Sequence, residues 1–118
     1  MTNILIIDDS PQMGHMLTEL VRLLGYKSQF AQGGVAGVAA VQEQIPDLVL
    51  LDIMMPELNG WQVQERVRCF SSVPIIFVST DNSAVSRIQA AQVGCRLLPK
   101  NVTPAVLKKN IEEHLRVS

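Results

Sequence analysis

Four short apolar runs, distributed along the whole chain, constrain its fold more than any other feature of the sequence. They occupy residues 4–7, 48–51, 75–78 and 97–98, and none alternates between apolar and polar side chains. Uninterrupted apolar runs are typical of parallel strands that are buried on both faces. A more polar stretch at 27–31 is expected to form an edge strand, and segments with helical spacing separate the runs. This alternation predicts an α/β fold in which helices flank one parallel sheet.

Capping and breaking residues mark the ends of the expected helices. Ser10 and Thr103 can each cap a helix whose first turn holds a proline, and Gly25, Pro46 and Gly94 are expected to end helices. A weaker helix is expected near 34–45, and another opens after residue 60. The residues expected on buried helix faces are Met13, Met16, Leu17, Leu20, Val21 and Leu24, then Val63, Val67 and Phe70, then Ala84, Ile88 and Ala91, and finally Leu107, Ile111 and Leu115.

The length and composition of the chain indicate one soluble domain. Its 118 residues are expected to share one core as a single domain, 1–118. No apolar run approaches the roughly 20 residues that span a membrane, and no signal peptide is recognised, so a cytoplasmic protein is expected. Cys69 and Cys95 lack redox or zinc spacing and are expected to be buried or partly buried free thiols. The basic residues do not cluster with aromatic or helical readout elements, so nucleic-acid binding is not expected.

The apolar runs are followed by side chains that suit one kind of chemistry. Asp8 and Asp9 follow the first run, and Asp52 follows the run at 48–51. These strands are neighbours if the sheet has the doubly wound order 2-1-3-4-5, and ligands bind at the carboxyl ends of the strands in such sheets. Three carboxylates at close range repel one another unless a cation is bound. Oxygen ligands without histidine or cysteine favour Mg²⁺, which is the predicted cofactor.

The same edge of the sheet is suited to phosphoryl transfer. A carboxylate can act as a nucleophile toward phosphorus and form an aspartyl-phosphate. Asp52 stands alone on its strand opposite the acidic pair, which makes it the best-placed acceptor. Lys100 can supply an ammonium group and Ser79 a hydroxyl group to neutralise charge on the transferred oxygens. Each residue alone is weak evidence, but together they predict Asp52, Ser79 and Lys100 as catalytic residues.

With these residues in place, the chain resembles the receiver domains of bacterial response regulators from Ile4 to about Leu115. The matching elements are the pair Asp8-Asp9, the segment from Leu51 to Pro56 with Asn59-Gly60 behind it, Ser79 and Lys100. The resemblance implies a flavodoxin-like fold with five parallel strands and five flanking helices.

The resemblance also implies specific site roles and partners. A histidine kinase or phosphotransfer protein would donate a phosphoryl group from phosphohistidine to Asp52. Mg²⁺ would be held by Asp9, Asp52 and the backbone carbonyl of Met54, with Asp8 acting mostly through water. A downstream protein would bind the face formed by the fourth helix, fifth strand and fifth helix, and neither nucleic acid nor membrane would be a partner.

Two positions depart from the family pattern. Leu97 stands where an aromatic residue usually takes part in switching, three positions before Lys100. Asn101 stands where proline usually follows the lysine, and the Lys100-Asn101 bond is expected to be trans because a cis bond without proline costs about 3 kcal/mol. These departures affect the expected output mechanism more than the chemistry.

Other functions remain as alternatives. A phosphohydrolase that uses an aspartyl-phosphate is disfavoured, because Asp52-Ile53-Met54 lacks the second aspartate of a D-x-D pair. The protein is therefore not expected to be an enzyme that turns over a diffusible substrate, apart from its own phosphorylation and dephosphorylation. A pseudo-receiver that binds partners without being phosphorylated remains the alternative. The chain is either a stand-alone receiver or a piece of a longer regulator.

Overall fold

The five strands form one parallel sheet, and the predicted strand order is confirmed. The computed structural model describes residues 1–117, so Ser118 of the expected domain lies outside the described residues. The strands are β1 (Asn3–Asp8), β2 (Lys27–Gln32), β3 (Leu48–Leu51), β4 (Ile75–Ser79) and β5 (Arg96–Pro99), arranged in the order β2-β1-β3-β4-β5. All four neighbouring pairs are parallel. The strand order reverses beside β1 and β3, where ligands of such sheets bind.

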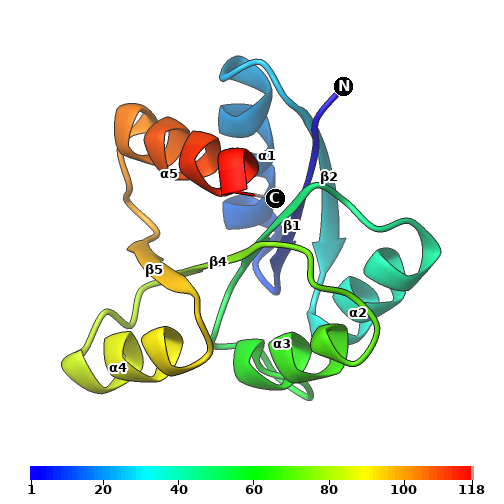
Figure 1. Ribbon diagram of the computed structural model, residues 1–118, viewed down its shortest axis with the longest axis vertical. Coiled ribbons are helices and arrows are strands. Elements are labelled where there is room, and N and C mark those ends of the chain that lie inside the picture. The colour runs from blue at the N-terminus through cyan, green and yellow to red at the C-terminus, as the bar shows by residue number, and fades with distance from the viewer. Residues whose placement is uncertain (118) are drawn as a thin grey trace.

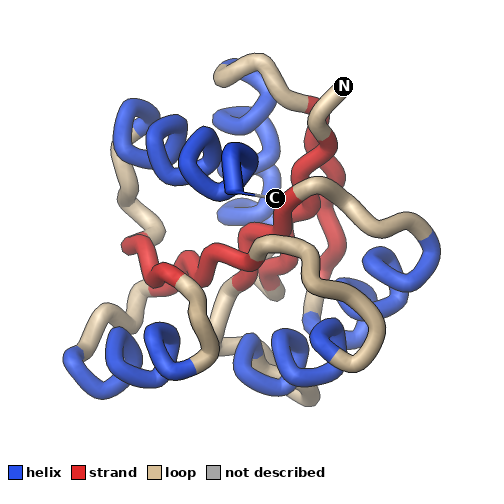
Figure 2. The backbone as a smooth tube through the Cα atoms, in the orientation of Figure 1, coloured by secondary structure: helices blue, strands red, loops and turns tan. Residues whose placement is uncertain are grey.

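Helices cover both faces of the sheet. The helices α1 (Pro11–Leu23) and α5 (Pro104–Val117) lie on one face, whereas α2 (Gly34–Glu43), α3 (Gly60–Arg68) and α4 (Ala84–Gln92) lie on the other (Figure 1). Figure 2 shows the strands as a central band between these two helical layers. Each layer encloses its own core, because successive strand residues point to opposite faces of a sheet.

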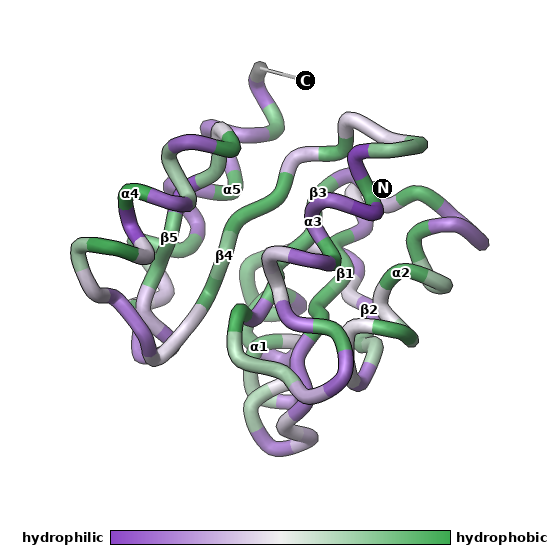
Figure 3. Tube along the Cα trace, turned by 90° about the horizontal axis from the view of Figure 1, so that it is seen from below, coloured by the Kyte–Doolittle hydropathy of each residue, from purple (hydrophilic) through white to green (hydrophobic). Residues whose placement is uncertain are grey.

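The side chains of the apolar runs are divided between the two cores. Leu5 and Ile7 of β1 pack with Phe77 toward α2, α3 and α4. Ile4 and Ile6 pack with Leu107 toward α1 and α5. The hydrophobic colouring of β4 along most of its length reflects this two-sided burial (Figure 3). No helix in the described part of the chain is long and apolar enough to cross a membrane.

The predicted helix starts agree with the structure. The Ser10 hydroxyl accepts a hydrogen bond from the Met13 amide, with Pro11 in the first turn of α1. The Thr103 hydroxyl accepts a hydrogen bond from the Val106 amide in the same way at the start of α5. These side chains satisfy backbone donors that have no partner within the helix. The chain therefore leaves β1 and β5 through short, fixed connections.

The buried face of α4 differs from the predicted one. The sequence places Ala84, Ile88 and Ala91 toward the core, but all three are exposed. Ser86 and Ala90 face the core instead. The reason is that the Ser86 hydroxyl donates a 2.6 Å hydrogen bond to Asp81, which offsets the cost of burying a polar group. Apolar spacing alone therefore predicts the wrong face.

Three smaller predictions are also corrected. Phe70 lies beyond the end of α3 and is 39% exposed, and Met16 on α1 is 49% exposed. Cys95 is buried and Cys69 is exposed, although both are free thiols as predicted. Phe70 and Cys69 follow the end of α3 at Arg68, and Met16 lines an open cleft instead of the core.

Candidate functional site

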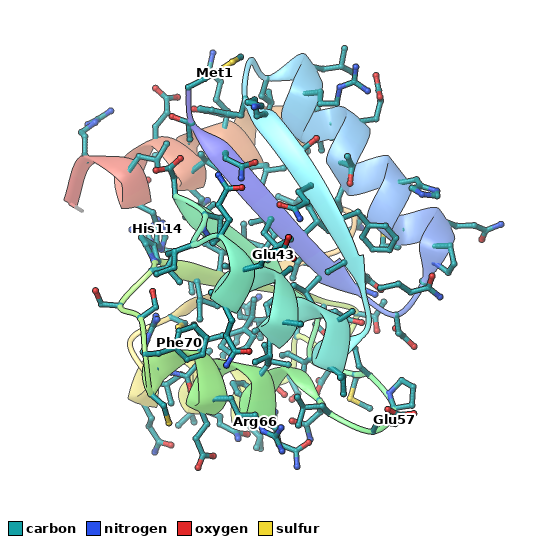
Figure 4. The ribbon with its side chains drawn as sticks, turned by 90° about the vertical axis from the view of Figure 1, so that its right-hand side faces the viewer. Met1, Glu43, Glu57, Arg66, Phe70 and His114 are labelled. Atoms are coloured by element: carbon teal, nitrogen blue, oxygen red, sulfur yellow. The ribbon has the colours of Figure 1, made fainter. Side chains whose placement is uncertain are left out.

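The predicted carboxylates meet at the carboxyl ends of β1 and β3. Figure 4 shows β1 and β2 running from the end of the molecule that carries Met1 toward the loop that carries Glu57. Asp8 is the last residue of β1, and Asp52 directly follows β3. One carboxylate oxygen from each of Asp8, Asp9 and Asp52 lies within 4.8 Å of the others. The pairing of Ile7 with Leu51 in the sheet brings these strand ends side by side.

Lys100 reaches this acidic cluster from the end of β5. Its Nζ atom lies 3.0 Å from Asp8 Oδ2 and 3.3 Å from Asp52 Oδ2. The Lys100 side chain is 12% exposed, and those of the two aspartates are at most 2% exposed. Burial opposes the charge on this ammonium group, but the hydrogen bond to Asp8 and the charge of Asp52 raise the pKa of Lys100 above its usual value. The lysine is thus held as a cation between two buried acids.

Asp52 is the least satisfied polar group among the described residues. Lys100 is close enough to pair with it by charge, yet neither Asp52 oxygen has a hydrogen-bond partner within the described chain. Burial, followed by the charge of Asp8, raises the pKa of Asp52 to about 6, against the opposing effect of Lys100. Buried carboxylates normally accept hydrogen bonds, so a buried carboxylate that pairs with Lys100 by charge but accepts no hydrogen bond indicates a site that binds something else.

The donor set fits a hard divalent cation. Asp8, Asp9 and Asp52 offer oxygen atoms only, and Mg²⁺ is usually bound by one or two carboxylates together with water and phosphate oxygens. The side chain of Met54 is 63% exposed, whereas Met55 is buried in the core. The thioether of Met54 therefore does not face the core, and a role for this residue in the site rests on its backbone carbonyl.

Ser79 is the last residue of β4 and is fully buried. Its sheet partner on β5 is Pro99, which directly precedes Lys100. The Ser79 hydroxyl oxygen accepts a 3.1 Å hydrogen bond from the Asp81 amide. Its own proton remains available for another acceptor. The strands thus bring the predicted hydroxyl and ammonium groups to the same edge of the sheet as Asp52.

An open cleft borders this edge. It measures about 560 Å³ and is lined by Met13, Met16, Ser79, Thr80, Pro99, Lys100 and Asn101. Met16 and Thr80 are residues that the sequence did not indicate as part of the site. Met16 follows the helical spacing of the core positions in α1, so nothing in the pattern distinguishes it from a core residue. The cleft borders Lys100 and the buried Ser79 on the side of α1.

The two departures from the family pattern have defined surroundings. Leu97 is 7% exposed and packs in the core that α4 covers. No cis peptide bond occurs in residues 1–117, so the prediction of a trans Lys100-Asn101 bond is confirmed. The Leu97 side chain therefore occupies, in the core beneath α4, the position at which the family usually has an aromatic residue.

Gly60 permits close packing between the start of α3 and the Asp52 segment. A Cβ atom at Gly60 would lie 2.4 Å from the Asp52 carbonyl oxygen and 2.7 Å from the Ile53 Cα atom. The Gly60 amide donates a 2.8 Å hydrogen bond to the Ile53 carbonyl. At the same helix start, Trp61 packs against Phe77 of β4 with ring centroids 4.6 Å apart. The first turn of α3 therefore lies against the segment that follows β3 and against Phe77 in the middle of β4.

Gly60→Ala is expected to displace the Asp52 segment. Both nearest contacts are backbone atoms that cannot rotate away, so we expect a loss of about 2 kcal/mol in unfolding free energy, typical of overpacking. Urea unfolding measures this loss.

Gly37→Ala is the matched control, because its Cβ would meet only the Ile7 side chain. Both variants should lose stability, but only Gly60→Ala should change the affinity of the acidic site for Mg²⁺, measured by titration. Equal Mg²⁺ affinity in the two folded variants would contradict this interpretation of Gly60.

Comparison with known families gives one consistent result. Residues 4–112 match the family described as response regulator receiver domain. The chain is 36% identical over 115 residues to the protein PilH of Pseudomonas aeruginosa, with 94% of this chain and 95% of PilH covered. It is 33% identical over 114 residues to the DNA-binding response regulator MtrA of Mycolicibacterium smegmatis, covering 96% of this chain but only 50% of MtrA.

Comparison of this chain with solved structures shows the same fold. The BeF3-activated N-terminal receiver domain of Klebsiella pneumoniae RstA aligns with a TM-score of 0.91 at 26% identity, over 98% of this chain and 99% of that one. The chemotaxis protein CheY4 of Vibrio cholerae aligns with a TM-score of 0.88 at 26% identity, again over 98% and 99%. Both similarities extend over nearly the whole described fold.

Proposed function

The chain belongs to the response regulator receiver domain family, and from this premise we propose that Asp52 accepts a phosphoryl group from the phosphohistidine of a kinase or phosphotransfer protein. The proposal rests on the surroundings of the Asp52 carboxylate. Its two oxygens are buried and lack hydrogen-bond partners among the described residues, although a lysine and two further aspartates lie beside them. This arrangement supports a nucleophile whose full set of partners includes a cation and a phosphoryl group.

The transfer exchanges one bond to phosphorus for another. An Asp52 carboxylate oxygen forms the new bond as the bond from phosphorus to the histidine nitrogen breaks. The nitrogen leaves with the electron pair and takes up a proton to become neutral imidazole. We assign Lys100 and Ser79 to the transferred oxygens, because an ammonium group and a hydroxyl group can stabilise the charge that they carry.

The acidic cluster would hold the cofactor. We propose that Asp8, Asp9, Asp52 and the Met54 carbonyl bind Mg²⁺, which would neutralise negative charge on the phosphoryl oxygens. Asp8 also has a second task, since its 3.0 Å ion pair keeps Lys100 beside Asp52.

The consequence of phosphorylation would be a change in partner binding. We propose that the face formed by α4, β5 and α5 contacts a downstream protein and that the protein turns over no diffusible substrate of its own. Val85 and Ile88 on α4 are 74% and 59% exposed, which supports an apolar contact there. We propose that phosphorylation and partner binding take place in this one domain, in the cytoplasm.

The test is the mass of the intact protein after incubation with a small-molecule phosphodonor. A gain of one phosphoryl group is expected with Mg²⁺ and not with excess chelator. If the folded protein gains no mass at any Mg²⁺ concentration, the proposal fails and the pseudo-receiver that only binds partners is favoured.

A further inference from the structure

The outward-facing surface of α2 carries little charge. None of residues 33–42 is charged, and Glu43 is the last residue of the helix. Val35 is 58% exposed, and Ala36 and Ala39 are exposed on the same helix. The outer face of a surface helix in a soluble domain normally carries charged and polar side chains. An exposed helix face without charges indicates contact with another protein surface.

A groove of about 450 Å³ lies between α2 and α3. Val35, Val38 and Ala39 line it from α2, and Leu58 and Phe70 line it from the segments that flank α3. Figure 4 faces this side of the molecule, with α2 in front and the labelled Phe70 beside the end of α3. The three α2 residues are separated by three and four positions, so they lie on one side of the helix. The groove therefore has an apolar wall along α2.

The walls of the groove favour a helix as its occupant. Both neighbouring elements are helices, whose backbone groups are bonded within each helix. The groove therefore offers side chains to an incoming segment, but no row of backbone donors and acceptors that an extended segment would need. A helix satisfies its own backbone groups and can pack its side chains between those of α2 and α3. Such an occupant needs apolar residues repeated along one face.

Two unpaired charges define the occupant further. Arg66 is the one charged residue that lines the groove, and its guanidinium group has no hydrogen-bond or ion-pair partner within residues 1–117. The Glu43 carboxylate at the end of α2 also has no partner in that part of the chain. The groove therefore suits a helix that has an uncharged face and a carboxylate near one end. The helix α2 itself has this composition.

We propose that the groove binds α2 of a second copy of this chain, so that two copies pair through the same face. In a two-fold arrangement each copy supplies a helix to the groove of the other. The apolar side chains of both α2 helices would be removed from water, and Arg66 of each copy would lie near Glu43 of the partner subunit. The pairing needs no phosphoryl group on Asp52, so it goes beyond the proposed function.

This face is distinct from the surface proposed to bind a downstream protein. In the helical layer that contains both helices, α3 lies between α2 and α4 (Figure 1). Two copies joined through α2 would leave α4, β5 and α5 of each copy exposed. The pair would therefore present two output faces to a partner.

The first test is sedimentation equilibrium of the protein without a phosphodonor over a range of concentrations. The parent is expected to pass from monomer to dimer as its concentration rises. Ala39→Glu should weaken the dimer about 100-fold, because it places a charge in the centre of an apolar contact. Leu23→Glu is the matched control, since it places the same charge at a 76% exposed position on α1, and it should dimerise as the parent does.

Charge reversal tests the predicted ion pair. Arg66→Glu and Glu43→Arg should each weaken the dimer about tenfold, and the double variant should recover most of the parent's affinity. The exposed thiol of Cys69 lines the groove and gives an independent readout. Its alkylation should slow as the protein concentration rises, whereas the buried Cys95 serves as the internal reference.

The outcomes separate this inference from the proposed function, which is tested by phosphorylation alone. A parent that stays monomeric at every concentration overturns the pairing and leaves the groove to a helix of another protein. A dimer that is equally strong in Ala39→Glu, or that leaves Cys69 fully reactive, also overturns it, because the contact would then lie on another face. Circular dichroism verifies folding, and Ala36→Glu replaces Ala39→Glu if that variant does not fold.

Discussion

Asp52→Asn is expected to abolish the Mg²⁺-dependent gain of one phosphoryl group in the intact protein. The amide is nearly isosteric with the carboxylate but is a poor nucleophile toward phosphorus. Mass spectrometry after incubation with a small phosphodonor measures the result. Asp47→Asn is the matched control, because Asp47 precedes β3 whereas Asp52 follows it, and it should be phosphorylated as the parent is.

The same variant is expected to be more stable than the parent at neutral pH without Mg²⁺. The pKa of Asp52 is raised from 3.8 to about 6, so the folded state holds a proton that the unfolded state releases in this interval. Rising pH therefore removes stability from the parent between about 4 and 6, and the loss is complete above that range. The gain in Asp52→Asn should be on the order of 2 kcal/mol at pH 7 and small at pH 4.

Denaturant unfolding at several pH values and Mg²⁺ concentrations measures this difference. Saturating Mg²⁺ should stabilise the parent more than Asp52→Asn, because the variant lacks one carboxylate ligand. A variant that is less stable than the parent at pH 7 would contradict the assignment of Asp52 as an electrostatically unfavourable residue. Phosphorylation of the folded variant at the parent's rate would exclude Asp52 as the acceptor.

Lys100→Met is expected to lower both stability and phosphorylation. Methionine has a similar length but leaves the carboxylates of Asp8 and Asp52 without their cation in a site where neither is more than 2% exposed. Removing one partner of a buried ion pair typically costs about 3 kcal/mol or more, and we expect a loss of that size at pH 7 without Mg²⁺. The phosphorylation rate should fall about 100-fold, as for removal of one group that stabilises a transition state.

Lys108→Met is the control for this change, because Lys108 is an exposed lysine on α5. Its effect on unfolding free energy should be within about 0.5 kcal/mol. The double variant Lys100→Met/Asp52→Asn should recover much of the lost stability but no phosphorylation. A stability loss in Lys100→Met that persists unchanged in the double variant would indicate lost packing instead of unpaired charge.

The sequence predicts the sheet and the meeting of Asp8, Asp52 and Lys100 at its edge for a shared reason. Apolar runs such as 48–51 must be buried on both faces, and this condition determines strand type and direction. In a parallel sheet the residues after such runs necessarily meet at one edge. The proximity of Asp8, Asp52 and Lys100 is therefore predictable without coordinates, although their distances are not.

The features that the sequence did not predict depend on contacts between segments. Ser86 is buried on α4 because Asp81 in the preceding loop satisfies its hydroxyl, which a count of apolar spacing does not consider. Met16 fits the apolar spacing of α1 but lies where the core ends and the cleft begins. The steric need for Gly60 appears only when α3 is placed against the backbone of Asp52. Individual side-chain environments therefore need the three-dimensional structure.

The contact between Trp61 and Phe77 gives this protein an intrinsic optical probe. Trp61 is the only tryptophan in the chain, so its emission spectrum has a single source. Its indole adjoins Gly60, which packs on the Asp52 segment, and touches the strand that ends at Ser79. A rearrangement at either strand end changes the surroundings of one fluorophore. Stopped-flow fluorescence can therefore follow events at the acidic edge in real time without any attached label.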